Sequence, residues 1–216
     1  MLDFFNFFFQ KPIKILVVIT FLFAVFSLSR RNSVHKYLIL ILLVCSLTEV
    51  VNSIIIFNNK SIVFSSTIGM ILHHILWLII LEKKIYFKTV FYVLLISFIV
   101  FAAVNLFFIY GINRFNSYTF VIGAFIYILI FIYESFYKLK HENFSYFFSN
   151  SYLLIFSPVL LFLGLSFYFG FKDSALGEIN VLSSIKLYDM IAYFANIIYY
   201  TLINIYIYRE RKLKHA

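Results

Sequence analysis

The chain has few charged residues. Asp, Glu, Lys and Arg make up 12% of its 216 residues, whereas an ordinary soluble domain has about 25%. With 63% hydrophobic residues, a soluble core would lack the polar surface that water requires. Cys45 is the only cysteine, which excludes an intrachain disulfide, and its apolar surroundings favour a buried hydrophobic role over a reactive thiol.

Sequence motifs for catalysis are also lacking. The chain has no GxSxG, no HExxH and no glycine-rich phosphate loop. His73 and His74 have no further ligands at metal spacing, so we expect no metal and no other cofactor. We therefore expect no catalytic residues.

Seven apolar stretches occupy most of the chain. A helix needs about 20 apolar residues to cross roughly 30 Å of hydrocarbon. We expect an all-α fold, a polytopic membrane helix bundle with seven transmembrane helices in a single domain over residues 1–216. The predicted spans are about 12–29, 37–57, 61–82, 88–110, 117–137, 151–171 and 185–208.

Lys and Arg are distributed unevenly between the linkers on the two sides of these spans. Of the 18, 12 fall on one side and 6 on the other. The positive-inside rule then predicts an outside N-terminus and a cytoplasmic C-terminus. The alternative is a cleaved signal peptide in the first span, but the preceding segment has no positive charge and no small-residue cleavage site is obvious before Arg30.

The formal net charge of +9 comes from residues at the span ends. Such residues set topology and attract anionic lipid, at about 1 kcal/mol each. We expect the partners to be the bilayer and, at the basic cytoplasmic face, anionic lipid. Nucleic acid is not expected, because no water-exposed stretch interleaves aromatic and basic residues.

Glu49 is the acid that lies deepest within a predicted span, roughly 18 Å from its inner end at 1.5 Å per residue. Ser46 and Asn52 lie three positions before and after it, so the three share a face that should point into the bundle. His73 and His74 lie at a similar depth in the next, antiparallel span. A contact between Glu49 and one histidine is geometrically plausible, since adjacent residues on a helix diverge by about 100°.

This intramembrane polar cluster, Glu49, Asn52, His73 and His74, has two interpretations. A histidine beside a carboxylate titrates near neutrality, which suits a proton-linked or ligand-binding site. The alternative is a hydrogen-bonded clasp that helps the two spans pack.

Four further positions are polar or helix-distorting. Glu134 has Lys138 at i+4, the favoured order for a helical ion pair at the membrane interface. Asn196 and Asn204 lie within the last span and are expected to hydrogen-bond across helices. Pro158 should kink the sixth span and is a possible hinge.

The layout resembles a loose family of bacterial orphan seven-span membrane proteins, which occur alone or attached to signalling domains such as histidine kinases. The likeness is carried by Thr48–Glu49, by Tyr133–Glu134, and by Asn196 with Tyr200. The resemblance implies a bacterial inner (cytoplasmic) membrane and a role in signalling, but no defined activity.

The expected function is that of a non-catalytic sensor, regulator or accessory subunit of a membrane-associated signalling or defence system. It would act through a protein partner or as a homo-oligomer. The first alternative is a small transporter or channel, proton-linked through Glu49 and His73 or His74. The second is an intramembrane enzyme, in which Glu49, His73 and His74 would converge on a water-accessible cavity.

Overall fold

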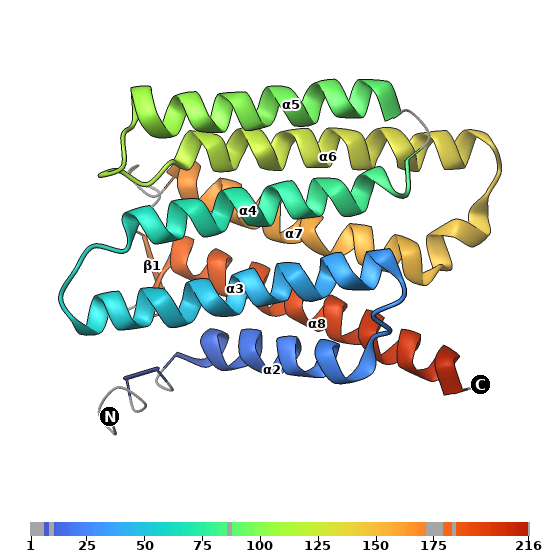
Figure 1. Ribbon diagram of the computed structural model, residues 1–216, viewed down its shortest axis with the longest axis horizontal. Helices are drawn as coiled ribbons and strands as arrows, with labels where there is room; N and C mark the ends of the chain where they lie inside the picture. Colours follow the sequence, from blue (N-terminus) through green and yellow to red (C-terminus); the bar gives the residue numbers. More distant parts are fainter. Residues whose placement is uncertain (1–6, 9–10, 86–87, 172–178, 183–184, 216) are drawn as a thin grey trace.

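The protein is a bundle of long helices that run side by side (Figure 1). The computed structural model describes residues 7–8, 11–85, 88–171, 179–182 and 185–215. Within these ranges the main helices are α2 (Pro12–Ser27), α3 (Ser33–Phe57), α4 (Val63–Glu82), α5 (Lys88–Val104), α6 (Ser117–Lys140), α7 (Asn150–Phe171) and α8 (Leu187–His215).

Six of these helices are long and apolar enough to cross a membrane, by length and composition. They are α3, α4, α5 with its continuation to Ile109, α6, α7 and α8. This is the architecture of an integral membrane protein. The remaining helix, α2, is apolar but has only 16 residues, fewer than the roughly 20 that a span usually needs.

Three short elements were not expected from the sequence. A π-helical turn, η1 (Asn105–Ile109), continues α5, and a 3-10 turn, η2 (Phe144–Phe148), precedes α7. Strands β1 (Asn180–Leu182) and β2 (Ile185–Lys186) form a small antiparallel hairpin before α8. All three lie at helix ends, where hydrophobic periodicity gives no signal.

The bundle is built around α4, α7 and α8. The most extensive contact of any pair joins α7 to α8, and α8 also packs against α2. The front helix α4 contacts α3, α5, α6 and α7, whereas α5 packs mainly on α4 and α6 at one edge (Figure 1). Large buried side chains such as Trp77, Tyr127 and Phe162 fill the centre.

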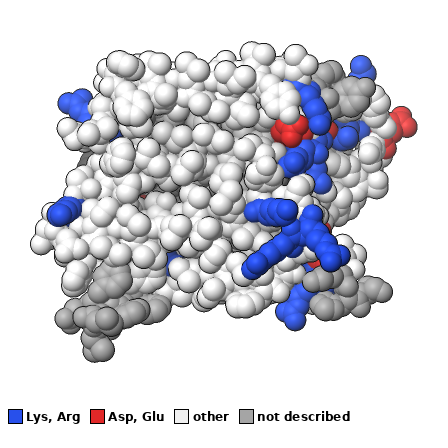
Figure 2. Space-filling model, in the orientation of Figure 1, with Lys and Arg blue, Asp and Glu red and all other residues white. Residues whose placement is uncertain are grey.

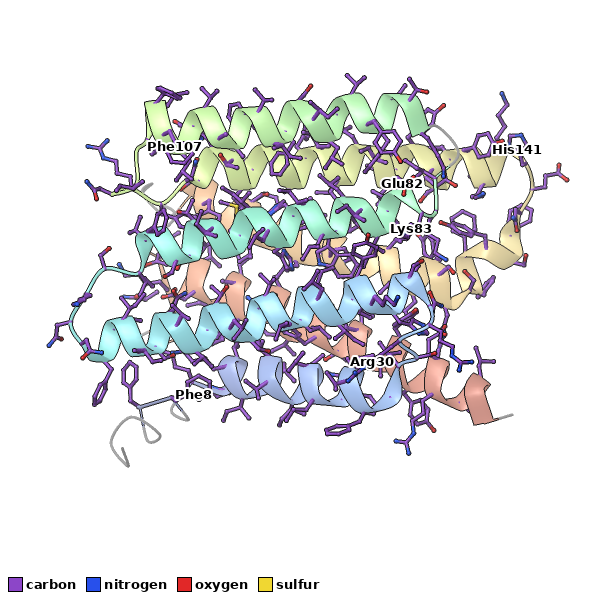
Figure 3. All side chains as sticks on the ribbon, in the orientation of Figure 1. Phe8, Arg30, Glu82, Lys83, Phe107 and His141 are labelled. Atoms are coloured by element: carbon purple, nitrogen blue, oxygen red, sulfur yellow. The ribbon has the colours of Figure 1, made fainter. Side chains whose placement is uncertain are left out.

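Successive helices run in opposite directions, so the connecting segments alternate between the two ends of the bundle (Figure 1). Arg30, Lys83 and His141 therefore lie at one end, and Phe8 and Phe107 at the other (Figure 3). Figure 2 shows most basic side chains gathered at the first of these ends, which we call the basic end. The uneven distribution of Lys and Arg in the sequence thus becomes a difference in charge between the two ends of the bundle.

Pro158 lies inside α7 and does not end the helix. A proline lacks the backbone N–H that would bond the carbonyl four residues earlier, here that of Leu154. The hydroxyl of Ser157 donates to this carbonyl at 2.8 Å, and Tyr127 donates to the neighbouring carbonyl of Ile155, also at 2.8 Å. Side chains thus replace the missing donor; whether Pro158 is a hinge stays a prediction.

A glycine of α4, Gly69, packs directly against Thr48 of α3. A Cβ atom built on Gly69 would lie 2.4 Å from Oγ1 and 2.8 Å from Cγ2 of Thr48. Both distances are shorter than van der Waals contact allows, so with a side chain at position 69 either the Thr48 side chain or one of the two helices would have to move. The lack of a side chain at Gly69 therefore leaves room for Thr48 of α3.

We predict that Gly69→Ala lowers the free energy of unfolding by about 1–3 kcal/mol, because overpacking a tight contact forces a backbone shift. Thermal unfolding of the purified protein in detergent measures the effect. Gly170→Ala is the matched control, since nothing lies within 4 Å of the Cβ it would add to α7. Equal melting temperatures of the two variants would contradict the close approach.

Candidate functional site

A cavity of about 290 Å³ opens among α3, α4, α7 and α8. This is close to the smallest ligand pockets, which begin near 300 Å³. The walls combine apolar side chains with a set of polar ones. The polar lining residues are Cys45, Thr48, Glu49, Asn52, Ser66, His73, Asn196 and Tyr200. The cavity thus brings together Glu49, Asn52 and His73 of the predicted cluster, together with Asn196.

Glu49 is the only acidic residue among the described lining residues. Its side chain is half-buried, and in the described ranges its carboxylate has neither a hydrogen-bond donor nor an ion-pair partner within 4 Å. A carboxylate at membrane depth is costly without a compensating charge or donor. The Glu49 carboxylate is therefore a hydrogen-bond acceptor for a ligand in the cavity.

Lys14 supplies a compensating positive charge, and no feature of the sequence pairs it with Glu49. Its ammonium group donates to the Ser53 hydroxyl at 2.5 Å, and this hydroxyl donates to the Glu49 carbonyl at 2.6 Å. Lys14 is buried and interacts with the Glu49 carboxylate through space. The rings of Phe7 and Phe8 cover the ammonium at 5.3 and 5.5 Å, in cation–π geometry.

The hydrogen-bonded clasp between α3 and α4 is made by Asn52. Its amide donates to Ser66 at 3.0 Å, and its carbonyl oxygen accepts from Ser65 at 2.5 Å. Both donors and acceptors come from adjacent helices, as expected for polar glue between spans. The structural role foreseen for the polar stripe of α3 is therefore carried by Asn52, one turn beyond Glu49.

The proposed contact between Glu49 and a histidine does not form among the described residues. Thr48 lies against Gly69, which places Glu49 about one turn of α4 before His73. His73 instead reaches Tyr199 of α8, with 3.1 Å between Nε2 and the hydroxyl. His74 stacks on Phe162 of α7, with ring centroids 4.5 Å apart.

His73, Trp77 and Tyr199 form a closed polar group inside the apolar core. The indole nitrogen of Trp77 lies 2.9 Å from the Tyr199 hydroxyl and 3.1 Å from His73 Nε2. Trp77 has one proton to donate. The Tyr199 hydroxyl has both a donor and an acceptor when Trp77 donates to it, it donates to His73 Nε2, and the histidine proton resides on Nδ1. Nε2 is then occupied and is not free to bind a ligand.

His74, the fourth residue of the predicted cluster, is not among the residues that line the cavity. Its Nδ1 lies 2.9 Å from the Met70 carbonyl and acts as the donor there, because a carbonyl oxygen accepts. In the described part of the chain its buried Nε2 has no hydrogen-bond partner. An aromatic enclosure of Phe98, Phe120 and Phe162 surrounds the ring.

Glu134 forms the predicted pair with Lys138, at 3.2 Å, but on a fully buried carboxylate. The same lysine lies 5.5 Å from the ring centre of Tyr146, in the turn η2. Burial raises the pKa of the Tyr146 hydroxyl, and the nearby Glu134 carboxylate raises it further. The pair thus joins α6 to the turn before α7.

The two asparagines of α8 behave differently. Asn204 donates to the Thr20 hydroxyl of α2 at 2.9 Å, which is the interhelical bond expected of it. Asn196 donates at 2.8 Å to the Ala192 carbonyl of its own helix, so it does not link helices through this bond. It lines the cavity instead, beside Tyr200.

Asn105 begins the π-helical turn η1 and was not singled out from the sequence. Its amide donates to Asn116 and, at 3.0 Å, to Thr119, and all three residues are buried. Asn116 also caps α6 by accepting from the Thr119 N–H. A lone asparagine in an apolar run was the available signal.

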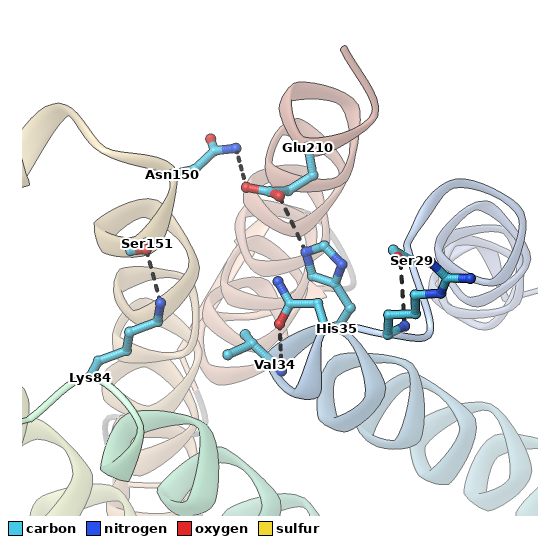
Figure 4. Close-up of polar contacts among 9 residues, drawn as sticks. Ser29, Val34, His35, Lys84, Asn150, Ser151 and Glu210 are labelled. Atoms are coloured by element: carbon cyan, nitrogen blue, oxygen red, sulfur yellow. Dashed lines mark hydrogen bonds and ion pairs between the residues drawn. The ribbon is translucent and has the colours of Figure 1, made fainter. Parts of the chain in front are cut away.

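A second polar cluster lies at the basic end (Figure 4). Glu210 of α8 approaches His35 of α3, with 3.2 Å between Oε2 and Nε2, and accepts from Asn150 of α7 at 2.8 Å. Beside them Lys84 donates to Ser151 at 3.1 Å. The sequence indicated only a basic tail around Glu210; the fold makes that acid the link among three helices.

Among the described residues no group of three His, Cys, Asp or Glu side chains is placed to hold a metal ion. No family model, no curated protein and no solved structure matches the chain.

We predict that Tyr199→Phe lowers the free energy of unfolding by about 0.5–1.5 kcal/mol, because it removes the hydrogen bonds of the hydroxyl while the Trp77 N–H can still donate to His73 Nε2, 3.1 Å away. Chemical unfolding in detergent measures the loss. Tyr208→Phe is the control, because Tyr208 is exposed on the same helix. If both variants are as stable as the wild type, the three-residue group contributes nothing to stability.

Proposed function

We propose that the protein is a non-catalytic membrane sensor or accessory subunit that binds a small ligand carrying a cationic group in the Glu49 cavity. The observation that carries this proposal is the carboxylate of Glu49, which has no donor or ion-pair partner within 4 Å among the described residues and lies on the wall of a cavity of ligand size. A ligand ammonium or similar group would supply the donor that Glu49 lacks.

The size and the lining of the cavity support a small, partly apolar ligand. Phe115, Phe120 and Phe169 lie on the wall with Glu49. Aromatic faces attract cations, and apolar walls favour the uncharged remainder of such a molecule. Thr48, Ser66 and Asn196 add polar groups that would fix its orientation.

A signalling output is supported by the link between the cavity and the basic end. Tyr200 and Asn196 on α8 line the cavity, and further along the same helix Glu210 contacts His35 and Asn150. A ligand that shifts α8 would alter those contacts at the end where we propose that a protein partner or a second copy docks. Signalling and defence systems are the settings that this proposal favours.

The proposal also includes the number and orientation of the membrane spans. We propose seven spans, with α2 as the first, the N-terminus outside and the basic end in the cytoplasm of a bacterial inner membrane. The 16 residues of α2 rise roughly 24 Å at 1.5 Å each, and a short span is tolerated by local thinning of the bilayer. Its packing against α3 and α8 supports a place within the bundle.

A proton-linked transporter is the second candidate. It is favoured by one observation, that Glu49 and His73 line the same cavity without touching. Under this proposal a water or substrate between them would carry the proton. Glu49→Gln would then abolish acidification of proteoliposome interiors by a substrate gradient, measured with a pH-sensitive dye.

The test of the sensor proposal is a purification from native membranes in mild detergent. We predict that wild-type protein retains a small molecule, seen by native mass spectrometry, and a stoichiometric protein partner, seen by proteomics. Glu49→Gln should lose the small molecule, because the amide keeps the shape of the side chain and removes its charge.

Glu142→Gln is the control, since Glu142 is an exposed acid in the turn after α6. It should retain both the small molecule and the partner. Wild-type protein that carries neither would count against the sensor proposal and in favour of the transport assay.

A further inference from the structure

A second and larger hollow lies between α5 and α6. This groove, which we call the α5–α6 groove, has a volume of about 560 Å³. Val90 and Leu94 form its wall on α5, and Leu129 and Ile130 form its wall on α6. It does not share a lining residue with the Glu49 cavity.

We propose that the α5–α6 groove binds one acyl chain of an anionic phospholipid, whose phosphate is held by lysines at the basic end. The proposal is independent of the function of the Glu49 cavity.

The lining of the groove matches an acyl chain. Nearly every side chain that faces it is apolar, and Tyr133 and Glu134 are the polar exceptions. The charge of Glu134 is compensated by Lys138 at 3.2 Å. An aqueous ligand would find few partners here, whereas a hydrocarbon chain buries apolar surface without losing hydrogen bonds.

The position of the groove makes lipid its ordinary neighbour. Both α5 and α6 are long and apolar enough to cross a membrane. Because α5 packs mainly on α4 and α6 at the edge of the bundle, much of its surface remains exposed, including Val90, Val93 and Ile96. A groove on such a face would be filled by a lipid chain unless protein covers it.

Charge at the end of the groove selects the head group. Lys88 begins α5, two residues before Val90, and its side chain is 62% exposed even while it pairs with Glu82 at 3.3 Å. Glu82 and Lys83 lie at this end, where α4 leads into α5 (Figure 3). The helix ends here carry five lysines, Lys83, Lys84, Lys88, Lys138 and Lys140, against three acids, Glu82, Glu134 and Glu142.

This excess of positive charge, together with the positive end of the α5 dipole at Lys88, favours a lipid whose phosphate-containing head group has a net negative charge. The combination of an apolar groove and a basic mouth distinguishes the proposed site from the general attraction of basic residues for anionic membranes.

The test is native mass spectrometry of the protein released from micelles that contain phosphatidylglycerol or phosphatidylcholine. Wild-type protein should retain one phosphatidylglycerol at roughly fivefold or greater preference over phosphatidylcholine, the ratio that about one lysine contact gives. Lys88→Gln should reduce this preference, and Lys60→Gln, at the opposite end, should leave it unchanged.

Leu94→Trp would fill the groove and should reduce lipid retention roughly tenfold. Val100→Trp is its matched control, because Val100 is an exposed residue of α5 that does not line the groove. Ile130→Trp fills the groove from α6 and should repeat the loss if Leu94→Trp fails to fold, as judged by its melting temperature.

Three results would overturn the proposal. One is equal retention in the groove-filling variants and in Val100→Trp. Another is equal retention of the two lipids by the wild type. The third is a lipid-free dimer that Leu94→Trp dissociates, which would show that a second copy covers the groove.

Discussion

Hydrocarbon offers no hydrogen bonds, so each polar group of a membrane helix needs a partner from the protein itself. Much of this structure meets that constraint locally. Ser157 supplies the donor that Pro158 lacks, and Asn116 caps α6 while it binds Asn105. Long-range bonds such as that from Asn204 to Thr20 then align helices that are distant in the sequence. Polar residues therefore serve two purposes: some satisfy groups of their own helix, and others join one helix to another.

The same constraint makes a polar group without a hydrogen-bond partner a candidate for a functional role. Glu49 faces a cavity without a donor in the described ranges, although Ser53, one turn along α3, is bonded to Lys14. The two residues on either side of Glu49 in the helix face, Ser46 and Asn52, are buried as the sequence predicted. Glu49 thus lies between two buried residues and lines the cavity. A carboxylate in a membrane helix is energetically costly, and such residues are often found in binding sites.

The helices themselves could be predicted from the sequence, because 20-residue apolar runs leave little choice of structure in a membrane. The ion pair of Glu134 with Lys138 could also be predicted, since both residues belong to one helix and follow its period. A contact between Glu49 and a histidine, which the sequence made plausible, does not form among the described residues, and the sequence could not decide it because it depends on the relative height of two helices. In the structure Thr48 lies beside Gly69, an alignment that neither hydropathy nor periodicity reports.

Contacts between distant segments were hidden for a similar reason. The sequence around Glu210 is basic and gives no sign that its acid meets His35 in the first turn of α3. Lys14 was counted with the residues at span ends, whereas the fold buries it against Ser53 and two phenylalanine rings. Such pairs require knowledge of which helices are neighbours, and an alternation of apolar runs does not supply it.

The packing of α8 against both α2 and α7 has a consequence for biogenesis. Helices are synthesised in the order of the chain, so α2 and α3 are made before α8, with four further helices between them. Until α8 is made, Thr20 lacks Asn204, and His35 lacks Glu210. Assembly of the bundle is therefore completed by its C-terminal helix, and a nascent chain that stops before α8 would present several polar side chains to lipid or to the quality-control machinery of the membrane.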